Sequence, residues 1–238
     1  MIKATAFILI GGKSNRFGSP KWEAIIDGKP VLDRLWNECS NFEHRFVVGK
    51  ENPGNVNKPF IYDELELLAP ITGLYTSLKH TKTDWNFLLS CDLPLINANI
   101  FNALWDARTK SVDAVVPYAN NRIQGTCAFY NKCILSRVEL AIDCSEYSLY
   151  SIADKLNSIK IEFGNDKRFW NMNTKKDYGE IIKYIRKLKL KKIQASGLYQ
   201  IENSGITLFE RISGSYFTIL GLPLMPLLKF LQKRKFLI

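Results

Sequence analysis

A segment with paired glycines and two cations has the composition of a phosphate-binding loop. It reads LIGGKSNRFGSPK over Leu9–Lys21, so that an apolar run ends in Gly11 and Gly12 and is followed by Arg16 and Lys21. Paired glycines let a backbone approach a ligand closely, consecutive backbone N–H groups attract anions, and both cations suit phosphate oxygens. We predict a phosphate-binding loop. The alternative from composition alone is a surface turn with solvated cations, since neither GxxxxGK(S/T) nor GxGxxG occurs in the segment.

A second candidate is the carboxylate of Asp92. It follows the apolar run Trp85–Ser90 and Cys91, in the sequence LLSCDLP. A carboxylate directly after a buried strand lies where α/β sheets present their ligands. Aspartate is a hard oxygen ligand, and Mg²⁺ takes few protein ligands alongside phosphate oxygens. We therefore predict that Asp92 binds Mg²⁺. Its alternative role is to cap a helix or a turn before Pro94.

Three more polar segments lie beside candidate strands or helix starts. Asp63 ends a short apolar run ahead of the sequence APITG, where the alternative role is that of an ordinary loop carboxylate. Gln124 precedes the apolar run GTCAFY, and Asn171 and Asn173 lie in the sequence RFWNMNTKKD. In this last segment Thr174 can cap the helix that follows, which is the structural alternative to a role in a site.

Strands and helices alternate along roughly the first 190 residues. Short apolar runs predict strands at Thr5–Ile10, Arg45–Val48, Pro59–Ile61, Trp85–Ser90, Asp113–Pro117, Gly125–Tyr130 and Ser158–Phe163. Apolar residues at helical spacing predict helices at Val31–Ser40, Gly73–Lys79, Ala98–Thr109, Lys132–Ile142, Ser148–Lys155 and Lys175–Lys187. This alternation predicts a three-layer, Rossmann-like α/β domain with a mostly parallel sheet, whose ligands bind beyond the carboxyl ends of the strands.

The length of 238 residues allows one large α/β domain and a short C-terminal appendage. Composition shifts over residues 188–197, which predicts a linker, so we expect a domain over 1–190 and a linker with a tail over 191–238. No apolar run reaches the roughly 18–20 residues that span a bilayer. The apolar run after Met1 is too short for a signal peptide. We therefore expect a cytoplasmic protein that does not bind a membrane.

The formal net charge of +10 suits either a nucleic-acid binder or an enzyme with polyphosphate ligands. Much of the excess lies in residues 183–192, a pattern typical of solvated helix faces or linkers. No aromatic-basic recognition module accompanies these runs, so we do not expect nucleic-acid binding. The five cysteines show no close pair with the spacing of a metal site or redox motif, which predicts reduced, partly buried thiols.

Five of these segments, over residues 1–188, resemble the motifs of molybdenum cofactor guanylyltransferases of the MobA type. The first resembles L-x-G-G-x-S-x-R-M/F-G-x-x-K, with Pro20 where the family often has an acidic residue. The others resemble G-P-x-x-G with Ala69 for the first glycine, C-D-x-P, Q-P-L-x-A-L-Y with Gly125 for proline, and F-x-N-I/M-N-T-P-x-D-L. Gly125 in place of proline predicts a more flexible loop. The family's asparagine after the second strand has no clear match in residues 48–52, so no role is assigned there.

The resemblance implies a nucleotide-diphospho-sugar transferase-type fold and an enzyme that transfers GMP from GTP to molybdopterin with Mg²⁺ as cofactor. Further partners that it implies are molybdoenzymes or proteins that insert the cofactor. The implied catalytic residues are Arg16, Lys21 and Asp92, and Asp92 is the metal ligand. The implied nucleotide-binding residues are Leu9, Ile10, Gly11, Gly12, Lys21, Asp63 and Asp92. The implied acceptor-binding residues are Gln124, Asn171 and Asn173.

Two other functions stay open from the sequence. Leu9, Gly12, Pro70 and Gly73 favour GTP in this resemblance, whereas Ile10 stands where guanylyl members have alanine. A CTP-dependent cytidylyltransferase, acting on molybdopterin or a sugar-like acceptor, is therefore the enzymatic alternative. An inactive nucleotide-binding fusion remnant is the other alternative.

The C-terminal residues resemble a different family. Residues 195–238 are similar to the C-terminal end of Maf-type nucleotide pyrophosphatases, with the sequences LFERISGSYF and LGLPL. That family's S-x-S-P-R-R loop and acidic centre are missing from this chain. We therefore expect no second hydrolase activity, and we expect a tail that is less well ordered than the main domain.

Overall fold

The computed structural model of the protein describes residues 1–11 and 17–196, with side chains up to residue 190. The chain divides into two compact units, Met1–Ile181 and Ile182–Ile238. The first unit carries the sheet and the candidate site. The predicted site residues Gly12 and Arg16, and the Maf-like tail from residue 197 onward, lie outside the described residues.

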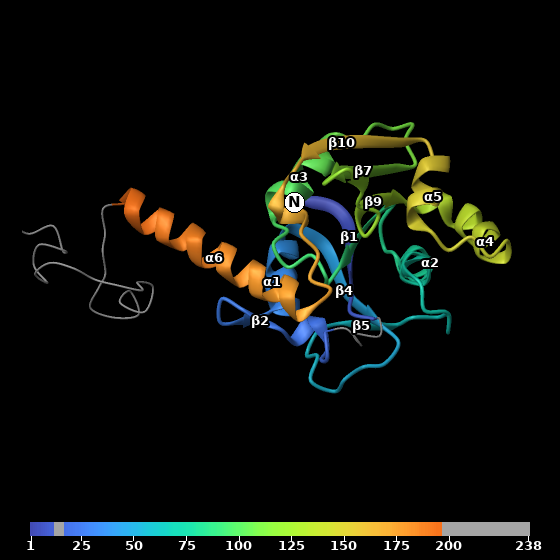
Figure 1. Ribbon diagram of the computed structural model, residues 1–238. Coiled ribbons are helices and arrows are strands. Elements are labelled where there is room, and N and C mark those ends of the chain that lie inside the picture. Colours follow the sequence, from blue (N-terminus) through green and yellow to red (C-terminus); the bar gives the residue numbers. More distant parts are fainter. Residues whose placement is uncertain (12–16, 197–238) are drawn as a thin grey trace, which may run out of the picture. The chain divides into compact units, whose positions relative to one another are not determined.

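One mixed sheet forms the centre of the first unit (Figure 1). In the described part of the chain its strand order is β10 (Ser158–Gly164), β7 (Ala114–Ala119), β9 (Cys127–Asn131), β6 (Trp85–Ser90), β1 (Ile2–Leu9), β4 (Phe42–Gly49) and β5 (Phe60–Tyr62), with β8 (Arg122–Ile123) paired to β7. β1 pairs in parallel with β4 and β6, β4 with β5, and β7 with β10, whereas β9 runs antiparallel to β6 and β7. The predicted mostly parallel sheet is confirmed. A separate ribbon pairs β2 (Ile25–Ile26) with β3 (Lys29–Pro30).

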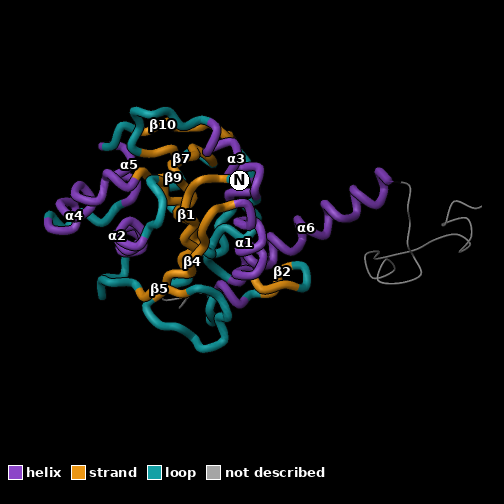
Figure 2. Tube along the Cα trace, turned by 180° about the vertical axis from the view of Figure 1, so that it is seen from behind, coloured by secondary structure: helices purple, strands orange, loops and turns teal. Residues whose placement is uncertain are grey.

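Helices cover both faces of this sheet (Figures 1 and 2). On one face lie α2 (Pro70–His80), α4 (Leu135–Asp143) and α5 (Leu149–Lys155), and on the other lie α1 (Val31–Glu38) and α3 (Ala98–Asp106). None of the helices in the described part of the chain is long and apolar enough to cross a membrane. The predicted three-layer α/β architecture is confirmed.

Apolar side chains fill the space between the layers. Leu74 of α2 and Val138 of α4 belong to one buried cluster with Phe7 of β1. On the opposite face Phe101 of α3 packs against Phe87 of β6, with ring centroids 4.6 Å apart. Because side chains alternate between the two faces of a strand, each central strand contributes to both cores. Removal of this apolar surface from water stabilises the layered fold and fixes the strand ends that carry the site.

α6 (Lys175–Ser196) begins where the sequence predicts and ends later. The predicted helix end at Lys187 is wrong, because the backbone is helical through Ser196, and the role of residues 188–197 as a linker stays a prediction. Leucine, lysine, glutamine and alanine favour helix, and no glycine or proline interrupts residues 188–196. At the start of α6, Asp177 N donates to Thr174 Oγ1 at 3.2 Å and Thr174 N donates to Asp177 Oδ2 at 2.7 Å. This reciprocal capping box confirms the predicted helix cap.

All five cysteines lie in the described residues, and none forms a disulfide bond. Cys39, Cys91 and Cys127 are buried, and Cys133 and Cys144 are exposed. Burial raises the pKa values of the three buried thiols well above their usual range, which keeps them protonated at neutral pH. The prediction of reduced, partly buried thiols agrees with this arrangement.

Candidate nucleotide-binding site

The carboxyl ends of β1, β4 and β6 meet at one edge of the sheet. Leu9 at the end of β1 is in register with Val48 of β4 on one side and with Ser90 of β6 on the other. Since all three strands run in parallel, the residues that follow them emerge together. These residues are Gly11 after β1, Lys50 after β4 and Asp92 after β6.

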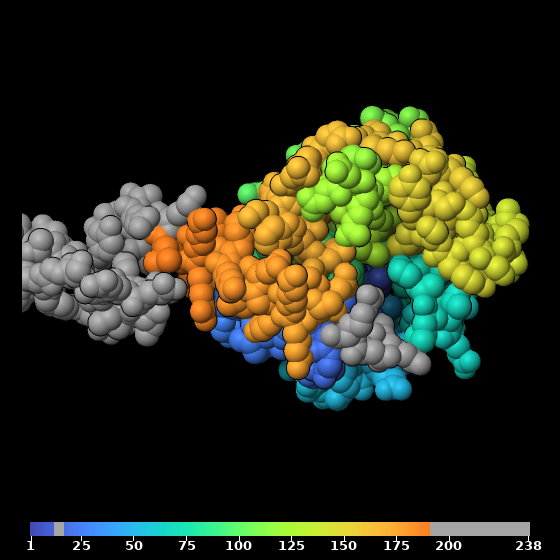
Figure 3. All heavy atoms as spheres, in the orientation of Figure 1, coloured from blue at the N-terminus to red at the C-terminus, as the bar shows by residue number. Residues whose placement is uncertain are grey.

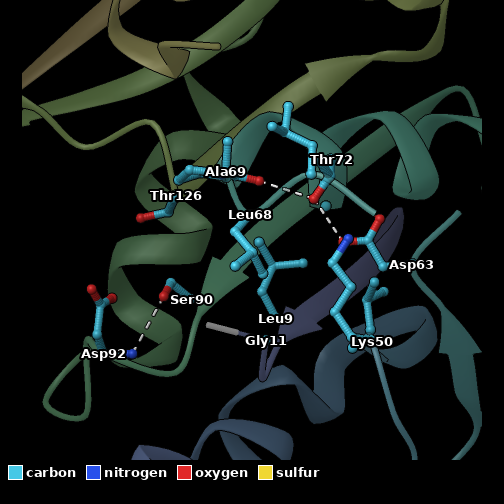
Figure 4. Close-up of a pocket in the computed structure, with 15 residues that line it drawn as sticks. Leu9, Gly11, Lys50, Asp63, Leu68, Ala69, Thr72, Ser90, Asp92 and Thr126 are labelled. Carbon is cyan, nitrogen blue, oxygen red and sulfur yellow. Dashed lines mark hydrogen bonds and ion pairs between the residues drawn. The ribbon is translucent and has the colours of Figure 1, made fainter. Parts of the chain in front are cut away.

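A cavity of about 330 Å³ opens at this edge, within the size range of small-molecule sites. Its lining includes Leu9, Gly11, Lys50, Asp63, Thr72 and Asp92. In Figure 4, Asp92 lies on one side of Leu9 and Gly11, and Lys50 and Asp63 lie on the other. The space-filling view shows dark blue atoms of the first strand at the bottom of a hollow beside the teal segment that contains α2 (Figure 3). The cavity therefore has two polar walls, one formed by Asp92 and the other by Lys50 and Asp63.

The segment between β10 and α6 connects Lys21 to Asp92. Lys21 Nζ donates to Asn173 Oδ1 at 2.7 Å, and Met172 N donates to the backbone oxygen of Asp92 at 2.8 Å. Burial, which has the largest effect, and the Asp92 carboxylate together raise the pKa of the Cys91 thiol to about 12, while the Lys21 ammonium acts to lower this pKa. Both charges thus act on the same thiol. Lys21 and Asp92 lie on the same side of the molecule, as a shared phosphate ligand requires.

One carboxylate oxygen of Asp92 has no partner among the residues that the structure describes. Oδ1 is buried and accepts no hydrogen bond from any residue that the structure describes. An unpaired buried carboxylate oxygen is destabilising, and a bound divalent cation would balance its negative charge. Mg²⁺ is commonly held by one or two carboxylates together with waters and substrate phosphates. Asp92 therefore fits the predicted ligand role. In the described ranges, no three acidic, histidine or cysteine side chains gather at a common metal position.

The carboxylate of Asp63 is occupied by groups of the protein itself. Thr72 Oγ1 donates to Oδ2 at 2.6 Å, Thr76 Oγ1 donates to Oδ1 at 2.9 Å, and Lys50 Nζ lies 3.2 Å from Oδ2. Asp63 lines the cavity, but its oxygens hold α2 and the lysine in place. Lys50 is a charged cavity residue that sequence reasoning missed. The available signal was its position directly after a strand, comparable to that of Asp92.

α2 approaches the end of β1 closely at Gly73. A β-carbon built on Gly73 would lie 2.7 and 2.8 Å from the two terminal methyl carbons of Leu9. These separations are shorter than van der Waals contact, so glycine is what permits this helix to pack against Leu9. Because Leu9 lines the cavity, the residue at position 73 affects the shape of the site.

We expect Gly73→Ala to raise KM for the nucleotide with little change in kcat. The added methyl group displaces the Leu9 side chain, and overpacking of this kind lowers the free energy of unfolding by about 1–3 kcal/mol. Steady-state kinetics and thermal unfolding measure the two effects. Gly179→Ala in α6 is the matched control, because a β-carbon there meets no atom within 4 Å. A KM equal to that of the wild type would contradict the proposed contact.

The three predicted acceptor residues occupy different environments. Asn173 holds Lys21, whereas Asn171 lines a second hollow of about 610 Å³. Gln124 is buried, and its Nε2 donates to Ala119 O at 3.1 Å within the β7–β8 hairpin. The structure thus gives Gln124 a structural contact and places Asn171 in a hollow of its own. Their roles toward an acceptor stay predictions.

Two positions singled out from the sequence are packed in the interior. Gly125 is buried, its carbonyl accepts a hydrogen bond from Tyr130 OH at 2.8 Å, and a β-carbon there would lie 3.0 Å from Leu149 Cβ. The sequence predicts a more flexible loop because glycine replaces proline; the structure shows a packed turn in which an added β-carbon would be in unusually close contact with Leu149. The side chain of Ile10, a predicted nucleotide contact, is likewise buried.

Comparison with known proteins shows which family the sequence matches. The family profile described as "MobA-like NTP transferase domain" matches residues 6–158. A protein from Aquifex aeolicus, called probable molybdenum cofactor guanylyltransferase, is 31% identical over 183 residues, which cover 75% of this chain and 90% of that one. A protein of the same name from Clostridium perfringens is 26% identical over 196 residues, covering 77% and 98%.

Solved structures share the same fold. The crystal structure of a putative protein from Aquifex aeolicus matches with a TM-score of 0.62 and 30% identity, covering 72% of this chain and 94% of that one. Molybdopterin-guanine dinucleotide biosynthesis protein A from Archaeoglobus fulgidus matches with a TM-score of 0.66 at 20% identity, covering 77% and 99%. A second profile, "Maf-like protein", matches residues 166–234. The predicted Maf-like C-terminal region is confirmed, and its match begins earlier than residue 195.

Proposed function

Because this chain belongs to the MobA-like NTP transferase family, we propose that it transfers GMP from GTP to molybdopterin and releases pyrophosphate. The observation that carries the proposal is that Met172 and Asn173 contact Asp92 and Lys21 respectively, and that Asp92 lines the same cavity as Gly11. An ammonium group and an incompletely paired carboxylate that neighbouring residues bring to one part of the molecule suit a triphosphate bound with a divalent cation. The guanine base and the pterin acceptor are inferred from the activity for which the relatives are named.

The proposed reaction is an in-line displacement at the α-phosphorus of GTP. An oxygen of the terminal phosphate of molybdopterin forms the new bond to this phosphorus. The bond from the α-phosphorus to the oxygen that bridges to the β-phosphate breaks, and pyrophosphate leaves with the electron pair. The attacking phosphate is already ionised at neutral pH, so no general base is needed. The protein accelerates the step by positioning the reactants and neutralising charge.

Each proposed role follows from a side chain's position. Lys21, oriented by Asn173, neutralises negative charge on the departing phosphates. Asp92 would hold Mg²⁺, which when bound withdraws electron density from the triphosphate. Gly12 and Arg16 keep their predicted roles in the same loop as Gly11.

The two polar walls of the cavity orient the nucleotide in this proposal. When the phosphates of the nucleotide lie beside Asp92 and Lys21, its base points toward the wall formed by Lys50 and Asp63. Leu67, Leu68, Ala69 and Pro70 add apolar surface to the cavity lining, which suits a flat aromatic base. The acceptor is proposed to approach from the side of Asn171.

The test is pyrophosphate release with each of the four nucleoside triphosphates, with and without molybdopterin, in the presence of Mg²⁺. We expect release only when GTP and molybdopterin are both present. Release with CTP instead would replace the proposal with cytidylyl transfer. GTP binding without pyrophosphate release under all conditions would identify the chain as a nucleotide-binding remnant.

A further inference from the structure

Lys50 presents an ammonium group to the cavity that none of the roles above uses. Its Nζ is buried and lies 3.2 Å from Asp63 Oδ2, yet it donates no hydrogen bond to any residue in the described part of the chain. The side chain as a whole is 27% exposed and lines the cavity. An ammonium group carries three donors and no acceptor, and buried donors without acceptors are destabilising. A ligand that supplies an acceptor atom at this position would complete the site.

The Asp63 carboxylate holds this ammonium group and has little capacity left for a ligand. Each of its oxygens already accepts a hydrogen bond from a threonine of α2, Thr72 at 2.6 Å and Thr76 at 2.9 Å. Its side chain is only 9% exposed. A carboxylate that is enclosed in this way acts on a ligand through the cation that it orients. Asp63 is therefore a positioning residue, and Lys50 is the group that reaches the ligand.

We infer that Lys50 contacts the base of the bound nucleotide and selects a ring carbonyl oxygen over an amino group, an inference that rests on the proposed function. Asp92 and Lys50 lie on opposite sides of Leu9 and Gly11 (Figure 4), so phosphates at Asp92 leave the base beside Lys50. Guanine presents the acceptors O6 and N7 on one edge, whereas adenine has an amino donor in place of O6. The ammonium group of Lys50 can donate a hydrogen bond to O6 of guanine. The amino group at the same position of adenine is itself a donor and offers the ammonium group no acceptor.

The experiment compares three nucleotides in the wild-type protein and in Lys50→Met. GTP and inosine triphosphate carry O6, and 2,6-diaminopurine riboside triphosphate carries an amino group in its place. Dissociation constants are measured by calorimetry on the full chain with Mg²⁺ and without acceptor. We expect the wild type to bind the first two about 10- to 100-fold more tightly than the third. Lys50→Met should lose this preference by weakening only the first two.

Asp63→Asn separates orientation from direct contact. It keeps the side chain's shape and removes the charge that holds Lys50, so we expect it to lose part of the same base preference. A residue that served only the stability of the fold would not change that preference. If a thermal unfolding assay shows that Lys50→Met does not fold, the same three nucleotides are compared with Asp63→Asn instead.

Lys79→Met is the matched control for Lys50→Met. Lys79 lies on α2 outside the cavity lining and pairs with Glu64 at 2.6 Å, so its loss should change neither affinity nor preference. Equal weakening of all three nucleotides in Lys50→Met would place the ammonium on the phosphates and overturn the inference. An unchanged preference would overturn it as well. A different result would contradict the proposed transfer reaction: the wild type would bind GTP but release no pyrophosphate in the presence of molybdopterin.

Discussion

Replacing Asp92 with asparagine is expected to lower kcat about 100- to 1000-fold while the protein stays folded. Asparagine keeps the shape of the side chain and removes its charge, so the Mg²⁺ that Asp92 would hold loses its charged protein ligand. Oδ1 of the wild-type residue accepts no hydrogen bond from the described residues, so the substitution breaks no bond at this atom that the fold uses. The thermal unfolding midpoint without nucleotide should therefore stay equal or rise.

Two measurements on Asp92→Asn test this expectation. Pyrophosphate release at saturating GTP gives kcat, and thermal unfolding with Mg²⁺ and GTP reports binding. A ligand at 100 times its dissociation constant stabilises a protein by about 2.7 kcal/mol, and this stabilisation should shrink in the variant. Asp154→Asn is the control, because Asp154 is an exposed carboxylate paired with Lys160 on the surface. Turnover of Asp92→Asn at the wild-type rate would exclude the proposed role.

Lys21→Met is expected to lower kcat/KM about 100- to 1000-fold. Methionine has a similar length and apolar stem, so the change removes the ammonium that neutralises the departing phosphates and little else. Lys160→Met removes a lysine from the surface pair with Asp154 and should leave kcat/KM unchanged. Wild-type kinetics in Lys21→Met would show that the phosphates bind elsewhere.

The hydrogen bond between Lys21 and Asn173 makes a second comparison possible. If Asn173 acts by orienting Lys21, Asn173→Ala alone should lower kcat/KM by about tenfold, and adding it to Lys21→Met should cost nothing more, because the group that it orients is already gone. If Asn173 instead binds the acceptor directly, the two losses should multiply. Kinetics of the two single variants and the double variant distinguish these roles.

Local sequence patterns determined the types and approximate limits of most elements. The apolar run Trp85–Ser90 has the same limits as β6, and the cap formed by Thr174 and Asp177 marks the start of α6. Such features depend on residues a few positions apart, which is why a linear pattern records them. The end of α6 was missed because residues 188–196, taken as a linker from their change in composition, consist of helix formers.

The same patterns identified part of the site. Gly11 and Asp92 were recognised because polar or flexible residues directly after apolar strands lie at the carboxyl edge of a parallel sheet. Lys50 occupies a comparable position after β4 and was passed over, because a lone lysine in a polar stretch has no local feature that separates it from a solvated one. Gln124 shows the opposite case, since its polar side chain is consumed by the hairpin backbone.

What only the tertiary structure decided is which of these groups meet. The order β4-β1-β6 places Lys50 and Asp92 on either side of Gly11, and the sequence order of the strands does not reveal that arrangement. Lys21 meets Asn173 across 152 positions of the chain. The pairing of the strands is set by how their apolar side chains pack between two layers of helices, and that packing depends on the whole core. The sequence alone could therefore supply the chemical groups, whereas the folded core fixed their distances and partners.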